Sequence, residues 1–142
     1  MADLYEILSR NETTKSRAQP SIIPLRDVSL LNDFYAQLNI YNDSEVMFPR
    51  EKRVIGIIGV NRAQSGIYEL EITNAHVRGK TLALTLIDQI PEGFKGGSML
   101  SVAGSPVLVA SIPYNILRIH ATYTPTSGRG QEFQEMKLNT TF

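Results

Sequence analysis

Four basic residues of the chain are placed to bind phosphate groups. Arg50, Lys52 and Arg53 lie within four positions directly after a proline, and Arg118 lies on the polar side of the alternating stretch "NILRIHATY". Basic side chains on strand faces neutralise phosphates without reading bases. These residues therefore predict salt-sensitive, sequence-independent binding of nucleic acid or anionic lipid. The alternative is an ordinary solvated surface with ion pairs, for example to Glu51.

No other group of residues has the spacing of a catalytic or metal site. His76 and His120 are the only imidazoles of the chain, neither lies in an HExxH or GxSxG context, and both are interpreted as incidental. Glu69 and Glu71 share one face of a predicted strand, which is also the usual way to solvate a sheet. The stretch "GFKGGS" lacks the spacing of a P-loop and is interpreted as a surface loop. We therefore expect no enzyme activity, no cofactor and no metal.

The overall charge conceals an uneven distribution. The chain has 142 residues, of which 14 are Lys or Arg and 14 are Asp or Glu. Between Arg50 and Lys80, six basic residues stand against three acidic ones, which predicts a local positive patch. The length fits one domain. The absence of cysteine and of a signal-peptide pattern favours a cytosolic or nuclear compartment over a secreted one.

Strand patterns dominate the middle of the chain. In "GIYELEIT" and "KTLALTLI" every second residue is apolar, so residues 53–87 are predicted to form a three-stranded antiparallel meander. We expect an all-β or β-rich α+β fold, with antiparallel, sandwich-like sheets in a single compact core over residues 21–124.

The two ends of the chain are expected to lie outside this core. Leu4, Ile7 and Leu8 have helical spacing, which predicts a short N-terminal helix followed by a mobile arm within residues 1–20. A polar tail is expected over residues 125–142, with a possible closing element at "EFQEMKL".

The run from Val54 to Val60, "VIGIIGV", has no polar side chain, and it is far shorter than a membrane span. Two interpretations are open. In a monomer it is a central strand, whose glycines let another element approach closely. In an oligomer, Val54, Ile55, Ile57 and Ile58 face a neighbouring subunit. The same run and the apolar stretch "SPVLVASIPY" lead us to expect that the chain self-associates.

Short stretches of the chain resemble the small matrix proteins of bornaviruses and related negative-strand RNA viruses. The similar stretches are "FPREKR" before the apolar strand, "TLALTL" some thirty residues later, "QLNI" and "YNILRI", in similar order between about residues 35 and 120. The resemblance implies a β-rich structural protein of the virion with no catalytic residues. It also implies self-association, as a tetramer and then a lattice, beneath the viral envelope.

The resemblance further implies contacts with lipid headgroups and with the viral nucleocapsid or its RNA. Arg50, Lys52 and Arg53 lie within the first similar stretch and Arg118 within the last, so these residues would contact the anionic ligand. The expected location is the virion and the host cytoplasm or nucleus, peripheral to a membrane. A capsid subunit, or a phage tail or connector subunit without lipid binding, is the alternative.

Overall fold

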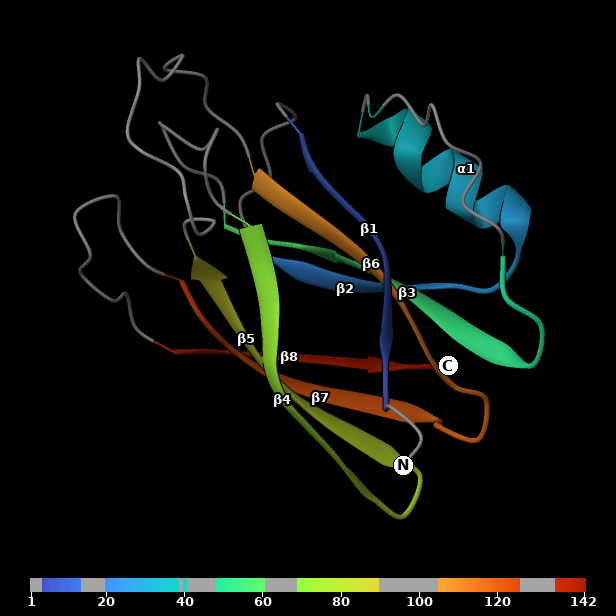
Figure 1. The fold of residues 1–142 in the computed structure, drawn as a ribbon, viewed down its shortest axis with the longest axis vertical. Coiled ribbons are helices and arrows are strands. Elements are labelled where there is room, and N and C mark those ends of the chain that lie inside the picture. Colours follow the sequence, from blue (N-terminus) through green and yellow to red (C-terminus); the bar gives the residue numbers. More distant parts are fainter. Residues whose placement is uncertain are drawn as a thin grey trace.

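The protein is β-rich, as predicted. The computed structural model describes residues 4–13, 20–38, 40, 48–60, 69–89, 105–125 and 135–142. These residues form a compact single domain of eight strands and one short helix (Figure 1). The elements are β1 (Glu6–Thr13), β2 (Ser21–Leu25), α1 (Val28–Gln37), β3 (Lys52–Ile58), β4 (Glu69–Arg78), β5 (Thr81–Gln89), β6 (Ser105–Pro113), β7 (Arg118–Thr124) and β8 (Met136–Thr141).

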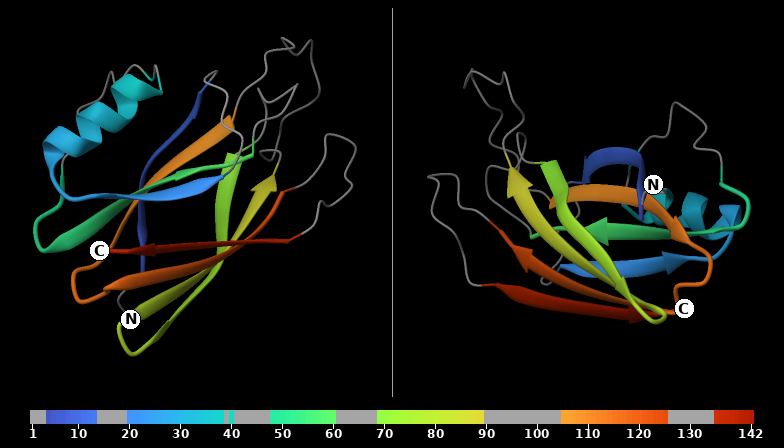
Figure 2. Two further views of the ribbon diagram at one scale, coloured as in Figure 1. Left: turned by 180° about the vertical axis from the view of Figure 1, so that it is seen from behind. Right: turned by 60° about the horizontal axis from the view of Figure 1, so that its bottom comes forward.

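The strands form two four-stranded sheets that face each other, and α1 lies on the outer side of one of them (Figures 1 and 2). The first sheet has the order β1-β6-β3-β2 and is antiparallel throughout. The second sheet has the order β4-β5-β7-β8, and its central pair β5 and β7 is parallel. Parallel neighbours need a crossover connection, and β6 provides it by running through the first sheet.

The two central strands of the first sheet, β3 and β6, are buried on both faces. Ile55 and Ile57 of β3 pack between the sheets against leucines of β5, while Val54 and Ile58 pack under α1. The helix covers the outer face of this sheet with apolar residues three or four positions apart, which lie on one side of a helix: Leu31, Phe34, Tyr35 and Leu38. This double burial explains the unbroken apolar run of β3, because a strand between two cores has no polar face.

Gly56 of β3 lets α1 approach the sheet closely, as the sequence predicted. A Cβ atom at this position would lie 2.6 Å from Cζ of Phe34, which is closer than real Cβ contacts. The helix begins after its N-cap residue Asp27, whose side chain accepts a hydrogen bond of 2.8 Å from the Leu30 N–H.

The N-terminal segment is a strand, so the predicted N-terminal helix is wrong. Residues 6–13 pair antiparallel with β6, from Glu6 opposite Ser111 to Thr13 opposite Ser105. The apolar residues suit a strand between two cores, because Leu4 and Ile7 pack against the core between the sheets and Leu8 packs against the core under α1. Pairing with the edge of β6 also satisfies the backbone groups of this strand. The first part of the predicted arm, up to Thr13, thus belongs to β1. Residues 14–19 lie outside the described part.

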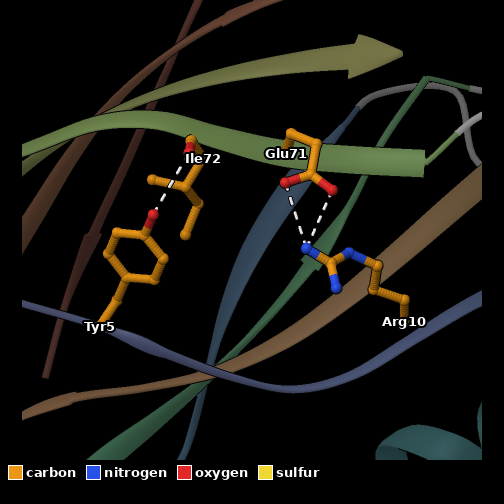
Figure 3. A network of polar contacts seen from close by, with 4 residues as sticks. All are labelled: Tyr5, Arg10, Glu71 and Ile72. Atoms are coloured by element: carbon orange, nitrogen blue, oxygen red, sulfur yellow. Dashed lines mark hydrogen bonds and ion pairs between the residues drawn. The ribbon is translucent and has the colours of Figure 1, made fainter. Parts of the chain in front are cut away.

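Contacts from the N-terminal segment also join the two sheets at one edge (Figure 3). The guanidinium of Arg10 lies 2.9 Å from the carboxylate of Glu71 on β4, and the hydroxyl of Tyr5 donates to the carbonyl of Ile72 at 3.4 Å. Of the two glutamates that alternate along β4, Glu71 thus has a partner in the opposite sheet.

The predicted meander of residues 53–87 is wrong in one of its two pairings. β4 and β5 form the expected antiparallel hairpin, but β3 belongs to the other sheet, between β2 and β6. Its apolar residues fill both cores, which requires a central position in the first sheet. Within the predicted polar tail, residues 136–141 form β8 and pair with β7. Residues 126–134 lie outside the described part.

Candidate functional site

The predicted interface residues of β3 are covered by their own chain. Val54, Ile55 and Ile58 are 0% exposed and Ile57 is 1% exposed. They have no surface left for a neighbouring subunit, so their assignment to an oligomer interface is wrong and the central-strand interpretation holds. The physical reason is that α1 and the second sheet already supply the apolar partners that this strand needs.

Arg53 joins the ends of the two sheets. Its guanidinium carbon lies 4.7 Å from the ring centroid of Tyr114 and 4.7 Å from that of Phe142, which follows β8. Its Nε–H donates a hydrogen bond of 2.9 Å to the carbonyl of Tyr114. A guanidinium between two rings is attracted by both, so Arg53 stabilises this end of the molecule.

The other predicted basic residues do not share one surface. Side chains alternate along β3, and since Val54 packs under α1, Lys52 points to the α1 side of the first sheet. Arg50 is exposed in the turn before β3. Arg118 is exposed on the outer face of the second sheet, because Ile119 beside it packs between the sheets. Lys52 and Arg118 thus lie on opposite sides of the domain.

The outer face of the second sheet carries basic residues from three strands in three rows. In the first row Arg78 pairs with Thr81, Thr81 with Arg118, and Arg118 with Thr141. The next row runs through His76, Ala83, His120 and Asn139, and the third through Asn74, Thr85, Thr122 and Lys137. We call these three rows the cationic face. Residues that pair across a sheet have side chains on the same face, so all of them point outward.

The long side chains of this face are basic, and the others are short. His76, Arg78, Arg118, His120 and Lys137 are exposed. Between them lie threonine, asparagine and alanine side chains, and none of the three rows contains a carboxylate. The ion pair between Arg10 and Glu71 lies at the sheet edge, outside the three rows. Within these three rows, therefore, no acidic side chain neutralises the basic groups.

Sheet geometry sets the spacing of these groups. Adjacent strands lie about 4.8 Å apart, so Arg78 and Arg118, which are two strands apart, have backbones about 10 Å apart. Rows of outward residues follow each other at about 6.8 Å along a strand. This regular grid fits a ligand that carries repeated negative charges. The face has no aromatic side chain on which a base would stack.

Exposed apolar side chains lie beside one end of the cationic face, outside its three rows. Tyr114 is 62% exposed and Leu117 is 39% exposed, in the connection between β6 and β7. The carbonyl of Lys80, in the β4–β5 turn, accepts hydrogen bonds from the N–H groups of Leu117 at 2.8 Å and Arg118 at 3.2 Å. Cations and apolar side chains are thus adjacent at this end.

Among the described residues one carboxylate, that of Asp88, is buried, and it is hydrogen-bonded within its own chain. Asp88 is 2% exposed, and the hydroxyl of Tyr123 donates to its carboxylate, with distances of 2.7 and 2.8 Å to the two oxygens. The same hydroxyl accepts a hydrogen bond of 3.0 Å from the Val60 N–H. The cluster lies between the sheets, where it satisfies buried polar groups away from any exposed ligand.

Sequence reasoning assigned Arg118 to the site and counted Arg78 only in the basic patch between Arg50 and Lys80. It interpreted His76 as incidental and did not single out Lys137. The signal was present, because these residues occupy every second position of their strands. Combining them required the register of β4, β5, β7 and β8, including the parallel pairing of β5 with β7. The stretch "GFKGGS" lies outside the described residues.

No protein-family model, curated protein or solved structure matches this chain. Within the described part of the chain, no helix is long and apolar enough to cross a membrane. Those same residues contain no cluster of three or more His, Asp or Glu residues suited to holding a metal ion.

Proposed function

We propose that the protein is a non-enzymatic structural protein that binds single-stranded RNA without sequence preference through the cationic face. The observation that carries this proposal is the grid of exposed basic side chains, from three strands, in three neighbouring rows of one sheet face that contain no carboxylate. Phosphate contacts of this kind give affinity that falls with salt and does not depend on base sequence.

The shape of the face favours RNA over a membrane as its ligand. A peripheral membrane protein inserts aromatic or large apolar side chains at the lipid interface. The cationic face has none, and its threonines and asparagines offer hydrogen bonds to phosphate and ribose oxygens instead. The rows extend across four strands, which suits a chain of phosphates better than a single headgroup.

The proposal includes self-association and the matrix-like role in a virion that the sequence resemblance implies. Stacked or neighbouring copies would extend the grid of basic residues along one RNA strand. Light scattering coupled to size exclusion at two salt concentrations measures this directly. A discrete oligomer at both salt concentrations supports the proposal, whereas a monomer at micromolar concentration under both conditions excludes self-association. Buried β3 residues are not candidates for the interface.

The binding proposal is tested by the salt dependence of RNA affinity at pH 8. Fluorescence anisotropy is recorded with two unstructured RNAs of unrelated sequence and tag-free protein. Three cations that each neutralise a phosphate of a single strand give a slope of log affinity against log salt of about −2. The triple variant Arg78→Ala, Arg118→Ala, Lys137→Ala should therefore lose about two units of slope with both RNAs.

A matched triple variant provides the control. Arg26→Ala, Arg50→Ala, Lys52→Ala also removes three exposed cations, but from outside the cationic face. It should keep the affinity and slope of the wild type. If it instead loses the slope while the first variant keeps it, RNA binds at the cluster before β3 and the cationic face is not the site. A loss confined to one RNA indicates base readout and contradicts the proposal.

A second candidate function is binding to anionic membranes at the end of the cationic face. The favouring observation is the exposure of Tyr114 and Leu117 next to Lys80 and Arg118. Apolar tips flanked by cations bind lipid interfaces that carry negative charge. Flotation with vesicles of phosphatidylserine and phosphatidylcholine tests it. The variant Tyr114→Ser, Leu117→Ser should lose flotation and keep RNA binding. Absence of wild-type flotation favours a capsid-like or tail-like subunit.

A further inference from the structure

Both histidines of the chain lie in the middle row of the cationic face. The sequence has two histidines, and the register places His76 opposite Ala83 and Ala83 opposite His120. Both imidazoles are exposed, and the small methyl group of Ala83 is the only side chain between them in this row. Histidine is the side chain whose charge ordinarily changes between pH 5 and 8. Both imidazoles of the chain therefore lie on this one face.

The groups that surround the two imidazoles on this face are neutral or positive. On β4 the neighbours of His76 are Asn74 and Arg78, and β5 contributes short side chains. On β7 the neighbours of His120 are Arg118 and Thr122, and on β8 they are Lys137, Asn139 and Thr141. None of these groups is a carboxylate. A proton gained by either imidazole thus adds a charge that only an external anion neutralises.

We infer that the cationic face binds RNA in a pH-dependent manner, with His76 and His120 gaining protons as RNA phosphates bind beside them. The inference rests on the proposed RNA-binding function. By thermodynamic linkage, a phosphate that stabilises the protonated imidazole raises proton uptake, and acidification in turn raises RNA affinity. Each imidazole takes its proton from solvent, so the face gains one positive charge per histidine and no covalent bond in the RNA changes.

The size of the effect follows from counting charges. Arg78, Arg118 and Lys137 are charged at every physiological pH, and two protonated histidines raise their number from three to five. For a single strand, each added phosphate contact contributes about 0.7 units of slope, so acidification should steepen the slope by about 1.4 units. At 0.15 M salt this corresponds to an affinity gain on the order of ten-fold.

The test compares RNA affinity and its salt slope at pH 8.0 and pH 5.5. The protein is tag-free, so that no added histidines titrate, and the probe is oligouridylate, whose base does not titrate in this range. The wild type should bind about ten-fold more tightly at pH 5.5, with a slope steeper by about 1.4 units. The variant His76→Gln, His120→Gln should bind equally at both pH values. Each single variant should lose about half of the steepening.

The variant Asn74→Gln, Asn139→Gln is the matched control, because it changes polar residues of the same face without removing a titrating group. It should keep the full pH effect. A double histidine variant that still tightens ten-fold at pH 5.5 overturns the inference. Failure of the proposed function is distinct, because it appears at pH 8.0 as unchanged RNA affinity when Arg78, Arg118 and Lys137 are replaced.

Calorimetry at pH 6.5 in two buffers of different ionisation enthalpy provides an independent measurement. RNA binding by the wild type should take up protons, and binding by the double histidine variant should take up none. Equal proton uptake by both proteins contradicts the inference even if their affinities differ.

Discussion

Replacing Gly56 by alanine tests how closely α1 packs on the first sheet. The new Cβ atom would lie 2.6, 2.8 and 3.0 Å from three ring atoms of Phe34. Ordinary van der Waals contact needs at least 3.4 Å, so the ring or the strand has to move by several tenths of an ångström. Neither moves easily. Phe34 is 4% exposed, and the strand at Gly56 is paired on one side with Ile23 and on the other with Val109.

The expected loss of stability combines two opposing effects. Overpacking of a well-filled core costs about 1–3 kcal/mol. Alanine also restricts the unfolded chain relative to glycine, which stabilises by about 0.4–1 kcal/mol. Gly56→Ala should therefore lower the free energy of unfolding by about 1–2 kcal/mol. Urea unfolding followed by circular dichroism should show a lower midpoint with an unchanged m-value.

A double-mutant cycle isolates the contact itself. In a Phe34→Leu background, which is itself less stable, the flat ring that meets the new methyl group is gone. Gly56→Ala should then cost no more than about 0.5 kcal/mol, which gives a coupling energy of about 1 kcal/mol between the two positions. Wild-type stability of Gly56→Ala, or an equal loss in both backgrounds, would refute the packing argument.

Three further predictions concern other contacts. Arg53→Ala removes a guanidinium that lies between two rings, so it should lower the free energy of unfolding, measured in urea, by about 1 kcal/mol. If this variant instead keeps its stability and loses RNA affinity, Arg53 is part of the RNA-binding site. Arg10→Ala and Glu71→Ala should each cost less than about 1 kcal/mol, because the ion pair is partly exposed, and a cost above 2 kcal/mol would contradict that estimate. Burial raises the pKa of Tyr35 above its usual value of 10.0, and the hydrogen bond with Ser9 opposes this shift in part. The stabilisation by the neutral Tyr35 side chain is therefore complete below pH 10 and is lost as the pH rises through the higher pKa of the folded state. Tyr35→Phe should reduce the loss of stability above pH 10, and an unchanged alkaline unfolding curve would show that the Tyr35 pKa does not contribute.

Local patterns predicted the second sheet better than the ends of the chain. The alternation of "KTLALTLI" placed Leu82, Leu84 and Leu86 in the core, and all three are buried. The glycine pattern of "VIGIIGV" predicted a close approach, which Phe34 makes at Gly56. These features depend on one strand at a time, and such periodicity is visible in sequence.

Features that depend on pairing between distant segments could not be predicted in the same way. The apolar residues around Ile7 fit a helix or a strand, and the free edge of β6, about 100 residues away, selects the strand. The cationic face likewise combines Arg78 with Arg118 through β5, in a parallel register that no local pattern specifies. Sequence reasoning therefore grouped Arg118 with Lys52, from which the sandwich separates it.

Nuclear magnetic resonance can show directly whether RNA binds at the cationic face. Backbone amide shifts of ¹⁵N-labelled protein are followed while an unstructured RNA is added at low salt. We expect the shifts to concentrate at Arg78, Thr81, Arg118, Thr141 and their neighbours in the three rows, with little change in α1 or at Arg50 and Lys52. Shifts confined to α1 and the turn before β3, with none across β4, β5, β7 and β8, would contradict it.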